Sequence, residues 1–185
     1  MSTAIAPASK PKLTQADALK YLTRFNLAEY SVILLGIRGY YKQTMGNPLK
    51  NDRGIYDDAI FVLTPDSFVS FNANTDPSVS RKGMAVLKSN SVYLYKIGMH
   101  NMKNPYKALR QFGRVTVIRD GAGEATDTPA APFYIDIHRG GYNTTSSLGC
   151  QTVPPTQWAA FLSLVEDQLK RYGQKIIPYV LVEAA

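Results

Sequence analysis

Tyr134–Val153 reads YIDIHRGGYNTTSSLGCQTV, and this stretch is the most informative part of the chain. Apolar and polar residues alternate at its start, and the pattern begins one residue earlier, at Phe133. This alternation predicts a strand over Phe133–His138 that ends on a histidine. A polar loop with glycines and hydroxyl side chains then leads to Cys150, the single cysteine of the chain. Cysteine chemistry needs a thiolate, a base that generates it, and N–H donors for the developing oxyanion. His138, Cys150 and the flexible Gly149 could supply these three functions.

The segment that follows the cysteine predicts an amphipathic helix and a last strand. Thr156 is the expected N-cap and Gly173 the expected stop of the helix. One face of the helix is apolar and consists of Trp158, Phe161, Leu162, Val165 and Leu169. The last strand is predicted over Ile176–Val182.

The segment that precedes the cysteine predicts a helix and then mostly antiparallel strands. Thr14 is the expected N-cap of that helix, which carries Leu19, Leu22 and Phe25 as a stripe and ends near Leu27. Strands are predicted over Ser31–Ile37, Ala59–Leu63, Phe68–Asn72, Gly83–Leu87, Val92–Tyr95 and Arg114–Ile118. Hairpin turns are expected at Thr64–Ser67 and at Lys88–Asn90, and a polar loop over Asp120–Pro132.

These elements predict one α+β domain, built on a mixed sheet or sandwich with two main helices. Residues 1–12 are rich in Ala, Pro, Ser and Lys and are expected to form a mobile tail, so that the domain spans 13–185. Two long segments without clear periodicity, Gly39–Asp58 and Asn74–Lys82, are expected to be loops, which often carry function at such lengths.

Composition narrows the possible functions. The net charge of +7 and the pI near 9.4 favour polyanions, but the basic residues are scattered and no nucleic-acid motif is present, so nucleic acid is not an expected partner. One cysteine and two histidines are too few for a disulfide framework or a structural zinc site, and Asp52, Asp57 and Asp58 lack the spacing of a calcium loop. We therefore expect no metal and no cofactor.

The apolar runs are too short to cross a bilayer, and Met1–Lys12 lacks the apolar core of a signal peptide. Synthesis is therefore expected to end in the cytoplasm of the host cell, with no stable membrane insertion. The protein is expected to be a monomer.

The motif His138, Gly140 or Gly141, Ser147, Gly149, Cys150 resembles the signature of the L,D-transpeptidase catalytic family. The resemblance implies that Cys150 is the acyl-accepting nucleophile and His138 its base. It also implies that backbone amides around Leu148, Gly149 and Cys150 form the oxyanion hole, and that a carbonyl near Arg139 orients the imidazole. Segments 36–63 and 71–78 are similar to phage and prophage proteins of lysis regions, which implies an endolysin-like enzyme acting on the cell wall.

A cleft for an acidic stem peptide of peptidoglycan is expected beside this motif, because guanidinium groups pair with carboxylates and tyrosines can flank an extended chain. The residues proposed for it are Arg38, Tyr40, Tyr41, Arg139, Tyr142, Asn143, Thr144 and Ser147.

The sequence departs from the family pattern at three places, which bear on substrate and reaction outcome. Leu148 stands where a second histidine is usual, so His138 is expected to act alone and His100 to take no part. Thr152 replaces the usual arginine or asparagine, and the interval of 12 between His138 and Cys150 is short. Net hydrolysis of stem peptides is the expected reaction, and the open alternatives are cross-link formation and a non-catalytic wall-binding protein.

Overall fold

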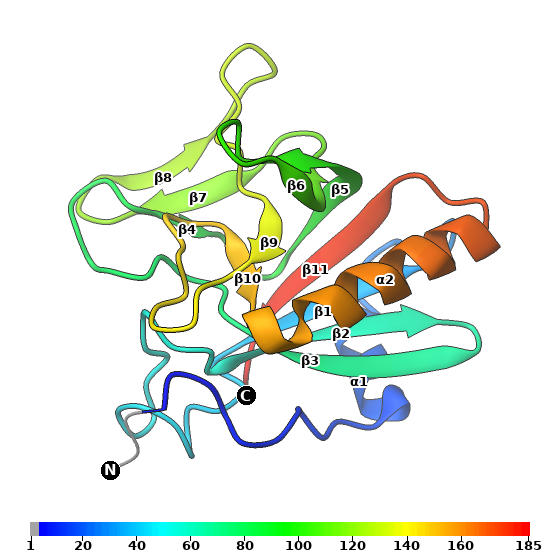
Figure 1. Cartoon of the computed structure of the whole chain (residues 1–185), viewed down its shortest axis with the longest axis horizontal. Coiled ribbons are helices and arrows are strands. Elements are labelled where there is room, and N and C mark those ends of the chain that lie inside the picture. The colour runs from blue at the N-terminus through cyan, green and yellow to red at the C-terminus, as the bar shows by residue number, and fades with distance from the viewer. Residues whose placement is uncertain (1–3) are drawn as a thin grey trace.

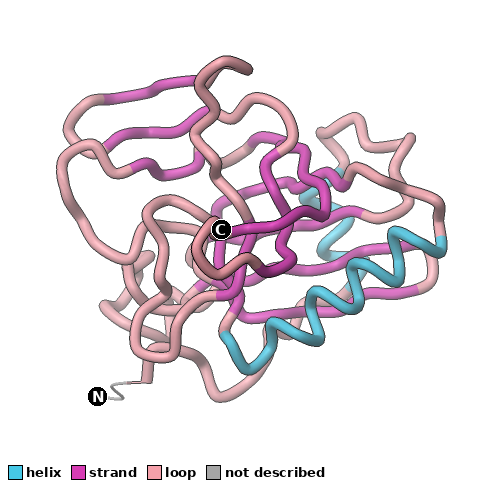
Figure 2. Tube along the Cα trace, turned by 45° about the horizontal axis from the view of Figure 1, so that its top comes forward, coloured by secondary structure: helices cyan, strands magenta, loops and turns pink. Residues whose placement is uncertain are grey.

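The computed structural model describes residues 4–185, which form a mixed α+β fold that is mostly β (Figure 1). Eight strands form the larger sheet, in the order β10-β9-β6-β5-β11-β1-β2-β3. They are β1 (Ile33–Arg38), β2 (Asp58–Thr64), β3 (Ser67–Ala73), β5 (Ser91–His100), β6 (Tyr106–Gln111), β9 (Ile137–Arg139), β10 (Gln151–Val153) and β11 (Ile177–Glu183). A smaller sheet lies to one side (Figure 2) and consists of β4 (Ala85–Leu87), β7 (Thr116–Arg119) and β8 (Gly123–Thr126).

The larger sheet is nearly closed at one end. Asn74, just after β3, and Thr152 in β10 exchange two backbone hydrogen bonds of 2.8 Å, so the two edge strands meet. This closure fixes the position of β10, and through it the position of Cys150.

Two hydrophobic cores lie on opposite faces of the large sheet because its central strands alternate between them. In β2, Ile60 and Val62 belong to the core that α2 (Pro155–Arg171) covers. Their neighbours Ala59, Phe61 and Leu63 belong to the core that α1 (Gln15–Leu22) covers. Burial on both faces explains the continuous apolar run of β2.

Both predicted helices exist, with corrections at their ends. The Thr14 side chain accepts a hydrogen bond from Asp17 N, as expected of an N-cap, but α1 ends at Leu22 and Leu19 is half exposed. The predicted N-cap Thr156 is wrong, because α2 already begins at Pro155, whose fixed φ suits the first helical position. Gly173 follows α2 with φ +61°, as expected of a helix stop.

Each predicted strand has a counterpart with shifted ends, and Thr64–Ser67 is a hairpin turn between β2 and β3. Lys88–Asn90 is not a hairpin, because β4 and β5 belong to different sheets. The strand predicted over Phe133–His138 is confined to Ile137–Arg139. Phe133 N and Ile135 N donate instead to the side chains of Asp127 and Gln111, which replace a neighbouring strand.

Three strands were missed by the sequence patterns. β6 reads YKALRQ and contains no β-branched residue, β8 lies inside the predicted 120–132 loop, and β10 has three residues. In residues 4–12, predicted as part of a mobile tail, Pro11 O accepts from Ser70 Oγ at 2.8 Å and Ser9 O from Tyr41 Oη at 2.9 Å. Met1–Thr3 lie outside the described residues, and the mobility of the tail stays a prediction. Neither helix within residues 4–185 has the length and apolarity needed to traverse a bilayer.

Candidate active site

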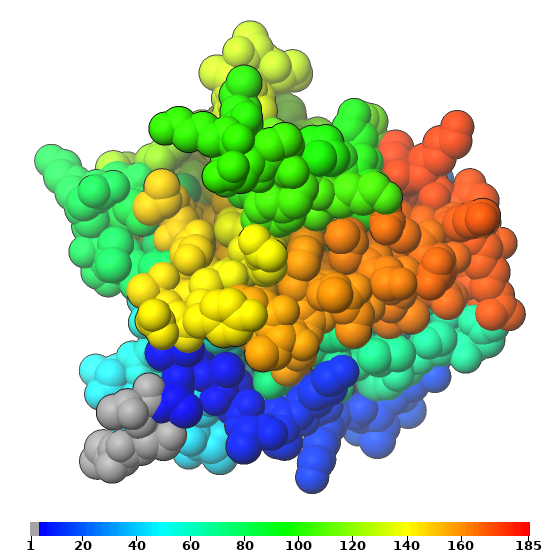
Figure 3. Space-filling model, viewed as in Figure 1, coloured from blue at the N-terminus to red at the C-terminus, as the bar shows by residue number. Residues whose placement is uncertain are grey.

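The parallel pairing of β9 and β10 brings the predicted catalytic residues to one place. Gln151 lies opposite Ile137 and Thr152 opposite His138 in this register, and Gln151 N donates to Asp136 O at 2.9 Å. Cys150, one residue before β10, is therefore beside Asp136. Because alternate residues of a strand share a face, Asp136, His138 and Cys150 lie on the same side. In the space-filling view this part of the chain (yellow) meets the start of α2 (orange) and the β5–β6 region (green) (Figure 3).

A tight turn holds the cysteine. Ser147 Oγ donates to Cys150 O at 2.7 Å and accepts from Gly149 N at 3.0 Å, while Ser78 bonds both the amide and the carbonyl of Ser147 at 2.8 Å. Gly149 has φ +141°, and a Cβ there would lie 2.5 Å from Ala85 O. Glycine is therefore required at this position.

His138 is buried, and a carbonyl fixes its orientation. Its Nδ1 lies 2.9 Å from Arg139 O, which can only accept, so Nδ1 carries the hydrogen and Nε2 is the basic nitrogen. A carbonyl near Arg139 is what the resemblance of the motif implied for the orientation of the imidazole. Burial lowers the pKa of His138 to about 4, and the charge of His100 acts in the same direction. His138 is therefore a neutral base at neutral pH.

His100, which the sequence excluded, stacks on His138. The two rings are 4.3 Å apart with an interplanar angle of 14°, and His100 Nδ1 is 2.8 Å from Asp136 Oδ2. Asp136 is buried, and its Oδ2 also lies 3.2 Å from Arg110 Nη1. His100 was missed because the predicted strand Val92–Tyr95 stopped five residues before the end of β5. The strand order that brings β5 beside β6 and β9 places His100 at the site, and no local pattern encodes that order.

The Cys150 thiol is protonated in the resting protein. Burial raises its pKa to about 12, although an N–H of Asp136 acts in the opposite direction. The thiol donates to Tyr134 O, with Sγ and O 3.5 Å apart. Tyr134 is exposed and has φ +57°, an uncommon conformation outside glycine. Cysteine and histidine are thus both neutral, and no resting thiolate–imidazolium pair is formed.

The predicted oxyanion donors differ in their availability. Gly149 N–H already donates to Ser147 Oγ, so the prediction does not hold for this amide. The N–H groups of Leu148 and Cys150 have no acceptor among residues 4–185, and the Leu148 side chain is exposed. These two amides remain the candidates for an oxyanion hole.

The predicted substrate residues do not form one cleft. Arg38 is buried, its guanidinium bonds Thr75 and Leu87 O, and it pairs with Asp76 and Glu183, so its expected role in an open cleft is wrong. Ser147 is buried and is committed to the cysteine turn. The exposed residues that remain near the site are Arg139, Tyr142, Asn143 and Thr144.

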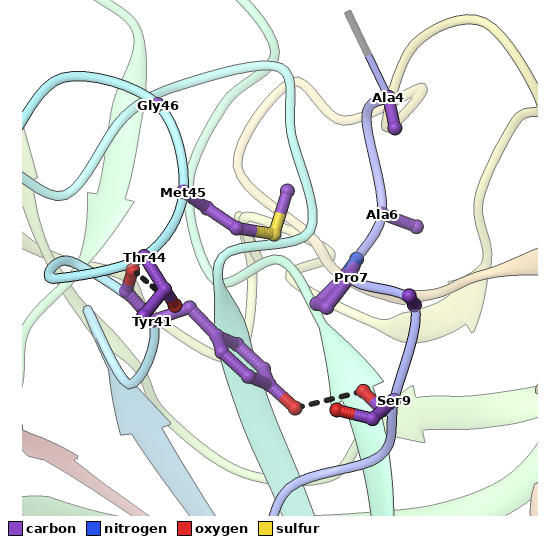
Figure 4. Close-up of a pocket in the computed structure, with 9 residues that line it drawn as sticks. Ala4, Ala6, Pro7, Ser9, Tyr41, Thr44, Met45 and Gly46 are labelled. Carbon is purple, nitrogen blue, oxygen red and sulfur yellow. Dashed lines mark hydrogen bonds between the residues drawn. The ribbon is translucent and has the colours of Figure 1, made fainter. Parts of the chain in front are cut away.

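The two tyrosines of the predicted cleft lie elsewhere. Tyr40 accepts from Lys12 N through its hydroxyl and packs against Phe61. Tyr41 lines a cavity of about 800 Å³ between the N-terminal segment and Thr44–Gly46, where its hydroxyl donates to Ser9 O (Figure 4). No cysteine, histidine or acid lines this cavity, so its lining offers no catalytic pair.

Among residues 4–185, no three His, Cys, Asp or Glu side chains are grouped so that they could hold a metal ion. Comparisons with family models, with curated proteins and with solved structures find no match to this chain.

Proposed function

We propose that this protein is a cysteine hydrolase of peptidoglycan stem peptides, with Cys150 as nucleophile and His138 as base. The observation that carries the proposal is that Cys150 and His138 share one face of the β9–β10 pair while Arg139 O leaves Nε2 of His138 as the basic nitrogen. The resemblance of this motif to L,D-transpeptidases, and of two other segments to phage lysis proteins, supplies the substrate class.

In the proposed reaction, proton transfer accompanies attack because both groups are neutral at rest. Cys150 Sγ bonds to a carbonyl carbon of the stem peptide while its proton passes to His138 Nε2. The oxygen becomes an oxyanion, which the N–H groups of Leu148 and Cys150 stabilise. His138 then gives the proton to the leaving amine, and a thioester remains on Cys150. Water attacks the thioester, His138 takes a proton from it, and the thiolate that leaves regains this proton.

Hydrolysis is favoured over cross-link formation by the loop between His138 and Cys150. Transferases must prefer an incoming amine over water, and a longer closing loop is one means of excluding water. Here Tyr142, Asn143 and Thr144 are exposed at the tip of a short loop. We therefore propose an L,D-transpeptidase-like fold whose thioester intermediate is attacked by water and not by an amine.

The test for hydrolysis supplies cross-linked dimers and tetrapeptide monomers in heavy-oxygen water. We expect dimers to decrease and the released peptides to carry one heavy oxygen at the new carboxylate. New cross-linked or amine-exchanged products without label would contradict hydrolysis and favour the transferase alternative.

A wall-binding protein without activity is the second candidate, because a thiol with a raised pKa is also what an inert cysteine would have. It differs from the enzyme in one measurable respect. Such a protein would sediment with sacculi and release no muropeptides from them.

A further inference from the structure

A basic pocket of about 390 Å³ adjoins the candidate active site and lies outside the predicted substrate residues. It is formed by β5, β6 and the segments that follow β6 and precede β9, and its volume is in the range of small-ligand sites. The residues that matter for its chemistry are Lys96, Met99, Arg110, Arg114, Pro132 and Tyr134.

Two residues join this pocket to the catalytic group. Tyr134 forms part of its wall, and the carbonyl of the same residue accepts the hydrogen bond from Cys150 Sγ. Arg110 also lines the pocket, and its Nη1 reaches Asp136, the partner of His100. Gly98 makes this reach possible, because a Cβ at Gly98 would lie 2.8 Å from Cγ of Arg110.

The strand register places the pocket and the histidines on one face. Lys96 lies opposite Arg110, and His100 lies opposite Tyr106 in the β5–β6 pair. Lys96 and His100 are four residues apart in β5, so their side chains point to the same side of the sheet. The surface that carries His100 thus continues into the pocket.

Three cations line the pocket, of which Arg110 is already paired with Asp136 and Arg114 lies close enough to Asp127 to lower the pKa of its carboxyl. No Asp or Glu lines it, and within the described part of the chain neither Lys96 nor Arg114 forms an ion pair. Lys96 Nζ rests 4.9 Å from the centre of the Phe112 ring, and Arg114 Nε donates to Asp127 O at 2.9 Å. Both cations therefore keep donors for an anionic ligand.

We infer that this pocket binds a carboxylate of the peptide that Cys150 attacks, an inference that rests on the proposed function and names the subsite that selects acidic stem peptides. Pro129 and Pro132 provide apolar walls for the aliphatic part of such a ligand. A nucleic acid or a polyphosphate would need a basic stripe along an extended path, whereas this pocket is small and bounded. Guanidinium groups bind carboxylates with two parallel hydrogen bonds.

The experiment measures binding in the Cys150→Ala protein by calorimetry, with a synthetic stem tetrapeptide whose carboxylates are either free or amidated. Lys96→Ala and Arg114→Ala should each weaken binding of the free acid about threefold to fivefold, since the lost contacts are exposed ion pairs. Lys96→Arg should retain the affinity. Lys175→Ala removes an exposed lysine beyond α2 and should change nothing. Arg110 is left intact because its loss would also disturb Asp136.

Equal binding of the free and amidated peptides, or equal affinities of the pocket variants and Lys175→Ala, would overturn the inference. Inorganic phosphate that binds as tightly as the peptide, with the same dependence on Lys96, would also overturn it, since the pocket would then be a general anion site. If the wild-type protein digests sacculi but the pocket variants bind the peptide as the parent protein does, the subsite alone is refuted. Carboxylate-dependent binding without any digestion would support the subsite and refute the hydrolase.

Discussion

At the scale of single residues, the protonated state of Cys150 gives the first prediction. Because its pKa is raised to about 12, the rate of alkylation by iodoacetamide should rise with pH from 6 to 10 without a plateau. Protein unfolded in urea should instead show a midpoint near the ordinary thiol value of about 8.5. A plateau at neutral pH in the folded protein would mean a resting thiolate and would contradict the neutral pair.

His100 gives the second prediction at this scale. His100→Phe keeps a ring against His138 but removes the bond to Asp136 and the charge that lowers the pKa of His138. We expect about a tenfold loss of kcat/KM. We also expect the acidic limb of the pH profile to move from near pH 4 toward the ordinary imidazole value.

His100→Ala is the companion variant, because it removes the ring as well and should lower activity further. A role of His100 in folding alone would reduce the amount of folded protein and leave the pH profile unmoved. An unshifted limb in His100→Phe would therefore contradict the effect of the His100 charge on the pKa of His138.

At the scale of elements, the cysteine turn depends on Gly149. Gly149→Ala would force a Cβ to within 2.5 Å of Ala85 O at a positive φ, and we expect it to lower the free energy of unfolding by about 2–4 kcal/mol and to abolish activity. Gly123→Ala is the matched control, since Gly123 also has a positive φ but no atom lies within 4 Å of the added Cβ. The control should cost about 1 kcal/mol by urea denaturation. Equal losses for the two variants would show that the contact with Ala85 is unimportant.

The sequence predicted the helices and strands whose apolar residues recur with a regular period and are buried in the structure. The apolar strands β1, β2 and β11 and the helix α2 were predicted because each buries a regular pattern of side chains. β6 was not, because YKALRQ contains no β-branched residue, although it forms a hairpin with β5. β10 was not, because it has only three residues and is held by its pairing with β9 and with Asn74.

The sequence predicted the residues of the candidate site that lie in one local motif, but not those that distant strands contribute. A local motif predicted Cys150 and His138 as the catalytic pair, and the resemblance implied a carbonyl near Arg139. His100, Asp136 and the pocket beside Tyr134 come together only through the order of strands β10-β9-β6-β5, which no local pattern encodes. Arg38 was misassigned because a basic residue near a loop gives no sign of burial.

At the scale of the whole molecule, a buried acidic cluster makes stability depend on pH. Burial raises the pKa of Asp57 to about 7, and the pKa values of Asp58 and Asp76 are raised for the same main reason. A folded-state pKa above the unfolded value favours folding below the unfolded pKa, and this contribution is lost as the pH rises through the folded pKa. The stability that these groups provide should therefore decrease from about pH 4 to above pH 7.

Asp57→Asn tests this linkage. Asp57 Oδ2 accepts a hydrogen bond from Asp52 N at 2.7 Å, which an asparagine oxygen can also accept. The free energy of unfolding is measured in urea at pH 4.5 and at pH 8 for both proteins. The difference between Asp57→Asn and the wild-type protein should favour the variant more at pH 8 than at pH 4.5, because only the wild-type protein must ionise a buried Asp57. Asp17→Asn, on the exposed surface of α1, is the control for a general charge effect. A difference between Asp57→Asn and the wild-type protein that stays the same at both pH values would contradict the raised pKa.

The central claim is that Cys150 performs the chemistry on the cell wall, and digestion of purified sacculi tests it most directly. Wild-type protein and Cys150→Ala are incubated with the same sacculi, and the soluble muropeptides are identified and quantified by mass spectrometry. Circular dichroism first verifies that both proteins are folded. We predict that the wild-type protein releases stem-peptide products and that Cys150→Ala releases them at least about a thousandfold more slowly, because no other thiol can form the thioester. Equal release by the two proteins, or no release by the wild-type protein, would contradict the account.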